Sequence, residues 1–325
     1  MTTTVAVGIA LAVTLAACTT EQTSDPAPTL TSTTSTTTTT TTTEPPPAPT
    51  VPETSVTTTT EPPAPSGPVD AVVPVFAGGD EGGWLFLGSW QFDAWAEPVD
   101  ADGEPVDPSI GAGTAASVLD LDDQRAGTFG EPALACFDDR TGPTVDVTVA
   151  APDPPGFGYA AIALPQPAWD LTPRPVAVSA SAPAAYTDLG VAAFAGDPVD
   201  ASLGSVQQLV VTDLDGDGDD EALVAFEYVQ PSAGPGAGGD LSGLLLVDTV
   251  TRQASTVERS FVDADLGPDE FPLIERYRVL AVADLNGDGR TEVAVHAWYY
   301  EGASVIVYGY DGAELTEVLA NGCGA

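Results

Sequence analysis

Two closely similar acidic loops constrain the fold of this chain more than any other feature of its sequence. Residues 213–221 are Asp-Leu-Asp-Gly-Asp-Gly-Asp-Asp-Glu, and residues 284–292 are Asp-Leu-Asn-Gly-Asp-Gly-Arg-Thr-Glu. Side-chain oxygens occupy positions 1, 3, 5 and 9 of each loop, and position 6 is a glycine, which can turn where a Cβ would clash. Hard cations such as calcium bind about six to eight oxygen ligands. The pattern therefore predicts two calcium sites.

The residues around the loops indicate strands rather than helices. An EF-hand has a helix on each side and a bidentate Glu at position 12, but that position is Val224 in the first loop and Val295 in the second. Segments that are apolar, β-branched or aromatic flank both loops at residues 209–211, 222–229, 279–282 and 293–300. We therefore expect each loop to connect two strands, which excludes an EF-hand.

Two further strand candidates follow each loop. They lie at residues 243–248, 254–262, 304–310 and 314–319. The loops begin 71 residues apart, a spacing compatible with a four-stranded unit that carries an insertion. The Gly- and Pro-rich segment 231–242 is the expected insertion in the first copy.

Over residues 206–319 the chain resembles the FG-GAP/VCBS-type repeats of integrin-α-like β-propellers, in which an Asp-x-Asp/Asn-x-Asp-Gly-x-x-Asp loop on a hairpin binds calcium. Here position 9 is Glu rather than Asp, and the Phe-Gly and Gly-Ala-Pro signatures are absent. The resemblance implies side-chain ligands at matching positions and backbone carbonyls at position 7. The implied ligands are Asp213, Asp215, Asp217, Asp219 (carbonyl), Glu221, Asp284, Asn286, Asp288, Arg290 (carbonyl) and Glu292.

The expected fold class is all-β and mainly antiparallel, with a partial or irregular β-propeller-like repeat domain and one short helix. The helix candidate is residues 183–195, whose apolar side chains are Tyr186, Leu189, Val191 and Phe194. Strands are also expected at residues 144–150, 159–164 and 175–180.

The beginning of the chain predicts export and a membrane anchor. Residues 1–17 form a short apolar stretch, which is typical of a signal-peptide core and too short for a permanent membrane span. Small residues directly before Cys18 resemble the bacterial lipobox, so we expect lipidation of Cys18 and a location on the extracytoplasmic face of the cell membrane. The alternative is a secreted protein with an unpaired cysteine. Residues 18–67 are rich in Thr and Pro, which predicts a disordered tether or an O-glycosylated stalk.

The rest of the chain divides into an N-terminal β-rich part, residues 68–205, and the two calcium-loop repeats, residues 206–325. Once Cys18 is assigned to lipid, Cys136 and Cys323 remain. In an exported and oxidising setting we expect these two cysteines to form a disulfide. The bond would connect the last strand to the first half of the domain.

Aromatic residues are concentrated near the start of the N-terminal part. Four of them stand at even-numbered positions, and such side chains lie on the same face of a regular strand. They are Trp84, Phe86, Trp90 and Phe92. Two functions fit such a face: packing in the core, or a platform that binds a sugar.

The charge of the chain excludes some partners. It contains 48 acidic residues and 8 basic ones, all arginine, and its formal net charge is −40. Binding to nucleic acid or to an anionic lipid surface through charge is therefore not expected.

The residue types also restrict catalysis. The single histidine, His296, is two and four residues before Trp298 and Tyr300, so in a strand the three side chains would lie on the same face. We therefore expect His296 on an aromatic sheet face, with a ligand contact as the alternative. One histidine gives little support to a Ser-His-Asp or Cys-His arrangement, and neither a phosphate-binding loop nor an HExxH zinc motif is present. Paired carboxylates, as in glycosidases, stay open as an alternative. We assign no catalytic residue.

Three hypotheses follow for the function. The first is a lipid-anchored, calcium-stabilised module that binds a protein or a glycan at the cell envelope. The second is a carbohydrate-active hydrolase or lyase in which calcium is structural, and the third is a purely structural surface protein.

We expect the first loop to depend more steeply on calcium than the second. It has four ligand carboxylates with Asp219 and Asp220 nearby, whereas the second has three carboxylates, an Asn and Arg290. Thermal unfolding of Glu221→Ala and Glu292→Ala variants across a calcium titration tests this expectation. An equal or smaller loss of calcium dependence in Glu221→Ala would contradict it.

Overall fold

The predicted leader and tether lie outside the part of the chain that the computed structural model describes. The described residues are 72–79, 83–100, 102, 104, 106–134, 143–149, 159–167, 169–171, 176–179, 182–230, 236–265 and 272–324. They all belong to one of the chain's two compact units, Thr59–Ala325. The predicted lipidation site Cys18 and the predicted disulfide partner Cys136 also lie outside the described residues.

The two loops and their flanking segments form two antiparallel sheets. The first contains β9 (Ser205–Thr212), β10 (Glu221–Tyr228), β11 (Leu241–Asp248) and β12 (Ala254–Phe261), with β8 (Ala177–Ser179) beside β9. The second contains β13 (Arg276–Ala283), β14 (Glu292–Tyr299), β15 (Gly302–Tyr310) and β16 (Leu315–Gly324). In both sheets four consecutive strands lie side by side in chain order, and the strand predictions for this half agree with the structure to within a few residues at each end.

Strands within residues 73–165 of the N-terminal part form a seven-stranded antiparallel sheet, whereas β8 and α1 (Ala184–Ala193) belong with the β8–β12 sheet. The strands of the seven-stranded sheet are β1 (Val73–Gly79), β2 (Trp84–Gln91), β3 (Ala94–Ala96), β4 (Ala115–Leu119), β5 (Gln124–Leu134), β6 (Pro143–Val149) and β7 (Tyr159–Pro165). Their order is β1-β7-β4-β5-β6-β2-β3, and β2 also pairs with β1. The sheet therefore curls around an interior in which the Phe76 ring lies 5.4 Å from that of Phe86 and 5.1 Å from that of Phe129.

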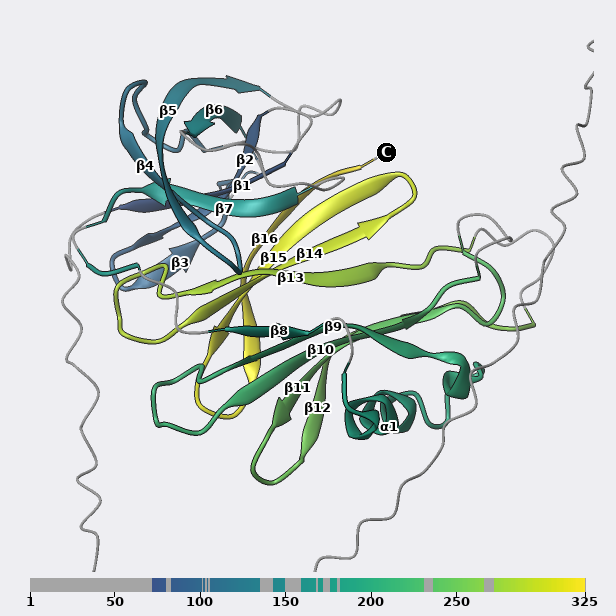
Figure 1. The fold of residues 1–325 in the computed structure, drawn as a ribbon. Helices are drawn as coiled ribbons and strands as arrows, with labels where there is room; N and C mark the ends of the chain where they lie inside the picture. Colours follow the sequence, from purple (N-terminus) through teal and green to yellow (C-terminus); the bar gives the residue numbers. More distant parts are fainter. Residues whose placement is uncertain are drawn as a thin grey trace, which may run out of the picture. The chain divides into compact units, whose positions relative to one another are not determined.

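The β13–β16 sheet is the middle layer of this unit (Figure 1). One face packs on the N-terminal sheet, where Leu280 and Val307 share a buried cluster with Leu87. The opposite face packs on the β8–β12 sheet, where Val295 shares a cluster with Val210. Because both faces are covered, β14 is apolar along most of its length, and its first six residues are buried.

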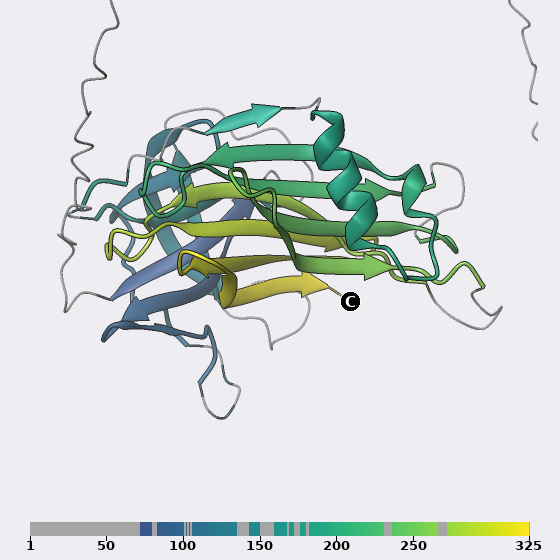
Figure 2. The same cartoon turned by 90° about the horizontal axis from the view of Figure 1, so that it is seen from below.

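A single α-helix among the described residues covers the outer face of the β8–β12 sheet (Figure 2). This helix, α1 (Ala184–Ala193), is followed by the short 3-10 helix η1 (Ala201–Leu203). A Cβ added at Gly190 or at Gly204 would approach the Phe226 ring to 2.3 Å or 2.2 Å, so both glycines are needed for close packing on that ring. The prediction of an all-β, mainly antiparallel fold with one short helix is confirmed. No helix in the described ranges is both long and apolar enough to cross a membrane.

A β-bulge divides the aromatic face that the sequence predicts for β2. The register between β1 and β2 shifts by one residue midway along the pair, and such a shift turns the following side chains to the opposite face. Trp84 and Phe86 therefore lie in the interior of the curled sheet, whereas Trp90 packs on the side of the β13–β16 sheet. Phe92 lies in the turn after β2. The prediction of one shared face is wrong.

His296 is buried on an aromatic face of β14. It is 3% exposed, stacks on Trp298 with ring centroids 4.7 Å apart, and meets Tyr159 of β7 edge-on at 5.8 Å. Its Nε2 atom has no hydrogen-bond partner among the residues that the structure describes. Burial, together with its cross-strand neighbour Arg278, lowers the pKa of His296 to about 4.

We expect His296 to make the fold less stable in mild acid. An unfolded histidine has a pKa near 6.5, so the unfolded chain takes up a proton at a higher pH than the folded chain does. The full stability is present above about pH 6.5, and up to roughly 3 kcal/mol is lost as the pH falls towards 4. Urea unfolding at pH 7 and pH 4.5 should show a smaller loss for His296→Phe than for the wild type. Equal losses in the two proteins would contradict this prediction.

Candidate metal centre

Both acidic loops close β-hairpins. The first connects β9 to β10, with Thr212 paired to Glu221, and the second connects β13 to β14, with Ala283 paired to Glu292. Position 9 is therefore the first residue of the following strand and faces the last residue of the preceding one. Strand pairing fixes the two ends of each loop and brings its first and last predicted ligands together.

Five hydrogen bonds from backbone N–H groups orient the acidic side chains of the first loop. They are Gly216 N to Asp213 Oδ1 (2.5 Å), Gly218 N to Asp213 Oδ2 (3.0 Å), Asp217 N to Asp215 Oδ1 (3.2 Å), Asp219 N to Asp217 Oδ1 (2.8 Å) and Leu214 N to Glu221 Oε2 (2.8 Å). Each predicted side-chain ligand of this loop accepts at least one of them.

The second loop has the same five hydrogen bonds at the same positions. They are Gly287 N to Asp284 Oδ1 (2.6 Å), Gly289 N to Asp284 Oδ2 (2.9 Å), Asp288 N to Asn286 Oδ1 (2.9 Å), Arg290 N to Asp288 Oδ1 (2.8 Å) and Leu285 N to Glu292 Oε2 (2.7 Å). The two loops therefore share one backbone geometry although three of their nine residues differ.

Three carboxylates of the first loop converge. Asp213, Asp215 and Glu221 each offer an oxygen, and these oxygens lie within 4.8 Å of one another. Calcium–oxygen bonds are roughly 2.3–2.6 Å long, so any two ligands of one ion are at most about 5 Å apart. Oxygens this close together could therefore contact one calcium ion. Among the described residues no second group of three such side chains meets this limit, and the second loop has the amide of Asn286 at position 3.

Glycines and a buried leucine give the loops their shape. Position 4 (Gly216, Gly287) has φ of 82° and 80°, and position 6 (Gly218, Gly289) has φ of 98° and 87°. L-residues avoid this region. The sequence prediction identified position 6 but not position 4. It also missed the leucines at position 2, Leu214 and Leu285, which are at most 1% exposed and hold the loops against the core.

Three of the acidic side chains, those of Glu221, Asp284 and Glu292, are held where their negative charges are poorly solvated. Burial, followed by repulsion from Asp215 and Asp213, raises the pKa of Glu221 to about 7, although the hydrogen bond from Leu214 N opposes the shift. Glu292 is 3% exposed, and burial raises its pKa well above the ordinary value. Burial also raises the pKa of Asp284. A divalent cation bound at these carboxylates would offset the repulsion.

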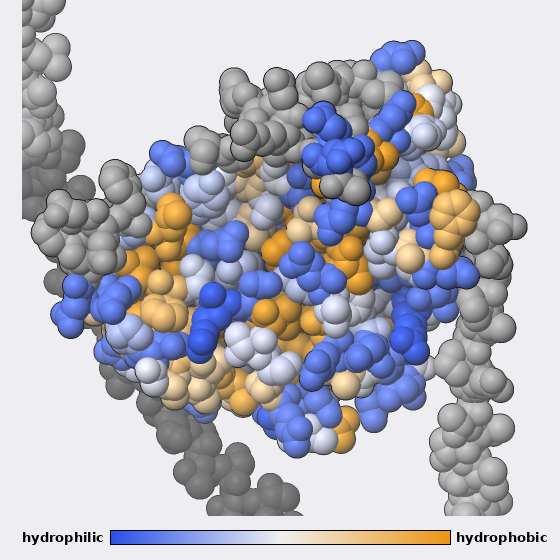
Figure 3. Space-filling model, turned by 180° about the vertical axis from the view of Figure 1, so that it is seen from behind, coloured by the Kyte–Doolittle hydropathy of each residue, from blue (hydrophilic) through white to orange (hydrophobic). Residues whose placement is uncertain are grey.

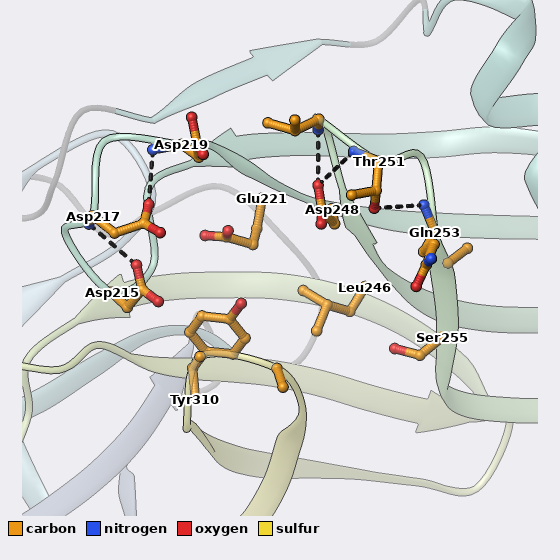
Figure 4. A pocket seen from close by; sticks show the side chains of 14 residues that line it. Asp215, Asp217, Asp219, Glu221, Leu246, Asp248, Thr251, Gln253, Ser255 and Tyr310 are labelled. Atoms are coloured by element: carbon orange, nitrogen blue, oxygen red, sulfur yellow. Dashed lines mark hydrogen bonds between the residues drawn. The ribbon is translucent and has the colours of Figure 1, made fainter.

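The first loop borders an open pocket of about 440 Å³. Its other walls are the β11–β12 turn with Asp248 and the β15–β16 turn with Gly312. Figure 4 shows Glu221 extending between the acidic loop and the β11–β12 turn, with the Tyr310 ring below it. Water and a soluble ligand can therefore reach the carboxylates on this side of the loop.

The second loop borders a smaller pocket of about 210 Å³ and is more deeply buried. Trp90 and Trp95 of the N-terminal sheet form part of its wall, and Tyr310 lines this pocket as well as the first. Trp169 Nε1 donates to the backbone oxygen of Asp284 at 2.9 Å. Thr291 Oγ1 donates to the backbone oxygen of Leu214, which connects the two loops directly.

The other predicted site residues are more exposed or lie outside the two loops. Asp217 and Asp219 are exposed at the first pocket, and Asp288 and Arg290 are exposed at the second. Cys323 is disulfide-bonded, but its predicted pairing with Cys136 stays a prediction because Cys136 lies outside the described residues.

Comparison of the chain with protein-family models, with curated proteins and with solved structures finds no significant match. The resemblance to FG-GAP/VCBS-type repeats therefore depends on the loops and their flanking strands alone.

We expect Gly218→Ala to weaken calcium binding as well as the fold. Gly218 and Gly113 have φ of 98° and 85°, and at neither position would a Cβ meet another atom within 4 Å. Alanine should therefore cost about 1–2 kcal/mol of backbone strain at either site. Gly113→Ala, which lies outside the loops, serves as the matched control. Thermal unfolding with and without calcium should show a reduced calcium effect only in Gly218→Ala; the same calcium effect in both variants would contradict the prediction.

Proposed function

We propose that the chain is a lipid-anchored, calcium-stabilised binding module of the cell envelope, without catalytic activity of its own. The observation that carries this proposal is the pair of hairpin loops with one hydrogen-bond pattern, the first of which brings three carboxylate oxygens within 4.8 Å of one another.

The ligand atoms favour calcium over other cations. They are carboxylate, amide and backbone oxygens, the donors that hard cations prefer. Magnesium requires near-octahedral geometry with bonds of roughly 2.0–2.1 Å and usually keeps several waters. A loop that can offer side-chain oxygens from four positions and a carbonyl from a fifth suits the larger and more variable calcium sphere. The burial of Glu221 and Glu292 beside other carboxylates adds a need for positive charge.

The position of the loops favours binding over catalysis. Both lie at the rims of pockets formed by hairpin ends, so bound ions would stiffen the turns around them. His296, the only histidine, lines neither pocket and is packed between Trp298 and Tyr159. It has no access to a substrate at either loop. On the face shown in Figure 3, hydrophobic side chains lie in separate areas with hydrophilic ones between them.

The sequence supports the location. An apolar leader with small residues before Cys18, followed by a Thr/Pro-rich segment, is the organisation of an exported lipoprotein whose folded part is held away from the membrane. The acidic composition, with a formal net charge of −40, keeps such a domain off an anionic lipid surface. Partners would therefore be protein or glycan components of the envelope.

Calcium should bind to the purified chain and stabilise it. At a free concentration about 100-fold above the dissociation constant, one site contributes roughly 2.7 kcal/mol, which raises Tm by about 5–10 °C. Titration calorimetry and thermal unfolding with calcium or with a chelator measure both effects. An Asp213→Asn/Asp284→Asn variant should lose most of the heat and the shift. Asp107→Asn removes a comparable exposed turn carboxylate outside the loops and should change neither. Absence of a calorimetric signal, with unfolding indifferent to chelator, would refute the proposal.

A further inference from the structure

The second loop faces an aromatic hairpin from the opposite end of the domain sequence. In the β2–β3 hairpin Trp90 and Trp95 are directly opposite each other, and their rings meet edge to face with centroids 5.3 Å apart. Both side chains are half-buried, and both line the pocket of about 210 Å³ at the second loop. The pocket therefore has an aromatic wall and an acidic wall that come from positions almost 200 residues apart in the chain.

The tip of this hairpin has an unfavourable conformation. The turn residues Phe92 and Asp93 have φ of 53° and 57°, a region that two-residue hairpin turns normally fill with Asn or Gly. A bulky residue with positive φ is an outlier. The Phe92 side chain is also 83% exposed. Phe92 thus lowers the stability of the isolated domain through its backbone and gains almost no packing, so its position points to a contact outside the chain.

Apart from Gly309 and Tyr310, the remaining wall of the pocket is polar. It includes carboxylates, a guanidinium, an amide and a hydroxyl, from Asn286, Asp288, Arg290, Glu292, Asp311 and Thr316. Aromatic rings beside closely placed hydrogen-bonding groups match the chemistry of a sugar, whose C–H face packs on a ring while its hydroxyls bind polar side chains. Because Asn286, Asp288 and Glu292 are also predicted calcium ligands, Arg290, Asp311 and Thr316 are the groups of this list left to hydrogen-bond a ligand in the calcium-loaded chain.

We propose that this pocket binds one residue of a neutral oligosaccharide on the Trp90–Trp95 pair, with Phe92 in contact with the adjoining part of the sugar chain. The inference rests on the proposed function, because it names the ligand class of the binding module. The volume of about 210 Å³ is below the roughly 300–1,000 Å³ of drug-sized ligand sites, so it suits a single sugar ring. With calcium held by Asn286, Asp288 and Glu292, the Asp311 carboxylate and its neighbour, the Arg290 guanidinium, balance each other in the wall, which favours a neutral sugar.

Substitutions in the hairpin separate recognition from folding. Asn accepts positive φ, so Phe92→Asn should raise Tm by roughly 2–4 °C, as expected for relief of about 1 kcal/mol of strain. The same variant should weaken saccharide binding about threefold to tenfold, because one aromatic contact is lost. Trp95→Ala should abolish measurable binding, and its Tm shows whether it folds. Tyr300→Ala, which removes an exposed aromatic side chain in the turn after β14, away from the second loop, should bind like the wild type.

The assay uses the calcium-loaded full-length chain and immobilised neutral and uronate oligosaccharides. Binding to neutral probes that Phe92→Asn weakens and Tyr300→Ala preserves supports the inference. Binding to uronate probes alone, equal binding by Phe92→Asn and wild type, or no binding at millimolar probe overturns it. Calorimetry of the same samples with calcium keeps the two proposals separate: a calcium signal without saccharide binding overturns this inference only. Release of reducing ends would instead contradict the non-catalytic part of the proposed function.

Discussion

The hydrogen bonds from backbone N–H groups to loop carboxylates are the interaction on which both candidate sites depend. They hold the acidic side chains of residues 213–221 in a fixed arrangement and do the same for residues 284–292. The resulting closeness of negative charges would destabilise an isolated turn. Here the flanking strand pairs and the buried Leu214 and Leu285 hold the turn in place. The fold therefore supplies the geometry, and a cation would supply the missing positive charge.

Polar contacts between the two stacked sheets determine where the loops lie relative to each other. The Gln208 side chain accepts from Val279 N at 2.8 Å and donates to Val279 O at 3.1 Å, at the point where the register of β13 shifts. Arg276 donates to both carboxylate oxygens of Glu227, at 2.9 Å and 2.6 Å. These directional bonds fix one alignment of β9–β10 against β13–β14, which nonspecific apolar packing would not do. Both acidic loops consequently lie at the same edge of the stack, with Tyr310 shared by their pockets.

The local sequence pattern was sufficient to predict the strands in the second half of the domain, because alternating or continuous apolar segments and Gly-rich turns determine strands directly. Residues 222–229 were expected as a strand, and β10 is Glu221–Tyr228. Contacts between distant segments could not be predicted in this way. Nothing near residue 284 indicates that Trp169 donates to its backbone or that Trp90 lines its pocket. The bulge in β2 likewise depends on its pairing with β1, so the alternation of residues along the strand alone assigned Trp84 and Trp90 to the same face, which is wrong.

The two loops differ in their number of carboxylates, and this difference follows from the electrostatic cost of burying charge. The first loop is mostly exposed beyond its third residue and has five Asp and one Glu. The second is more deeply buried, with Asn286 7% exposed, and replaces two of those carboxylates by Asn286 and Thr291 and a third by Arg290. Because an unsolvated charge costs more than an exposed one, a deeper loop of the same geometry can hold fewer carboxylates. Burial and charge are thus matched in the two loops: the more deeply buried loop has fewer carboxylates, as the cost of burying unpaired charge requires.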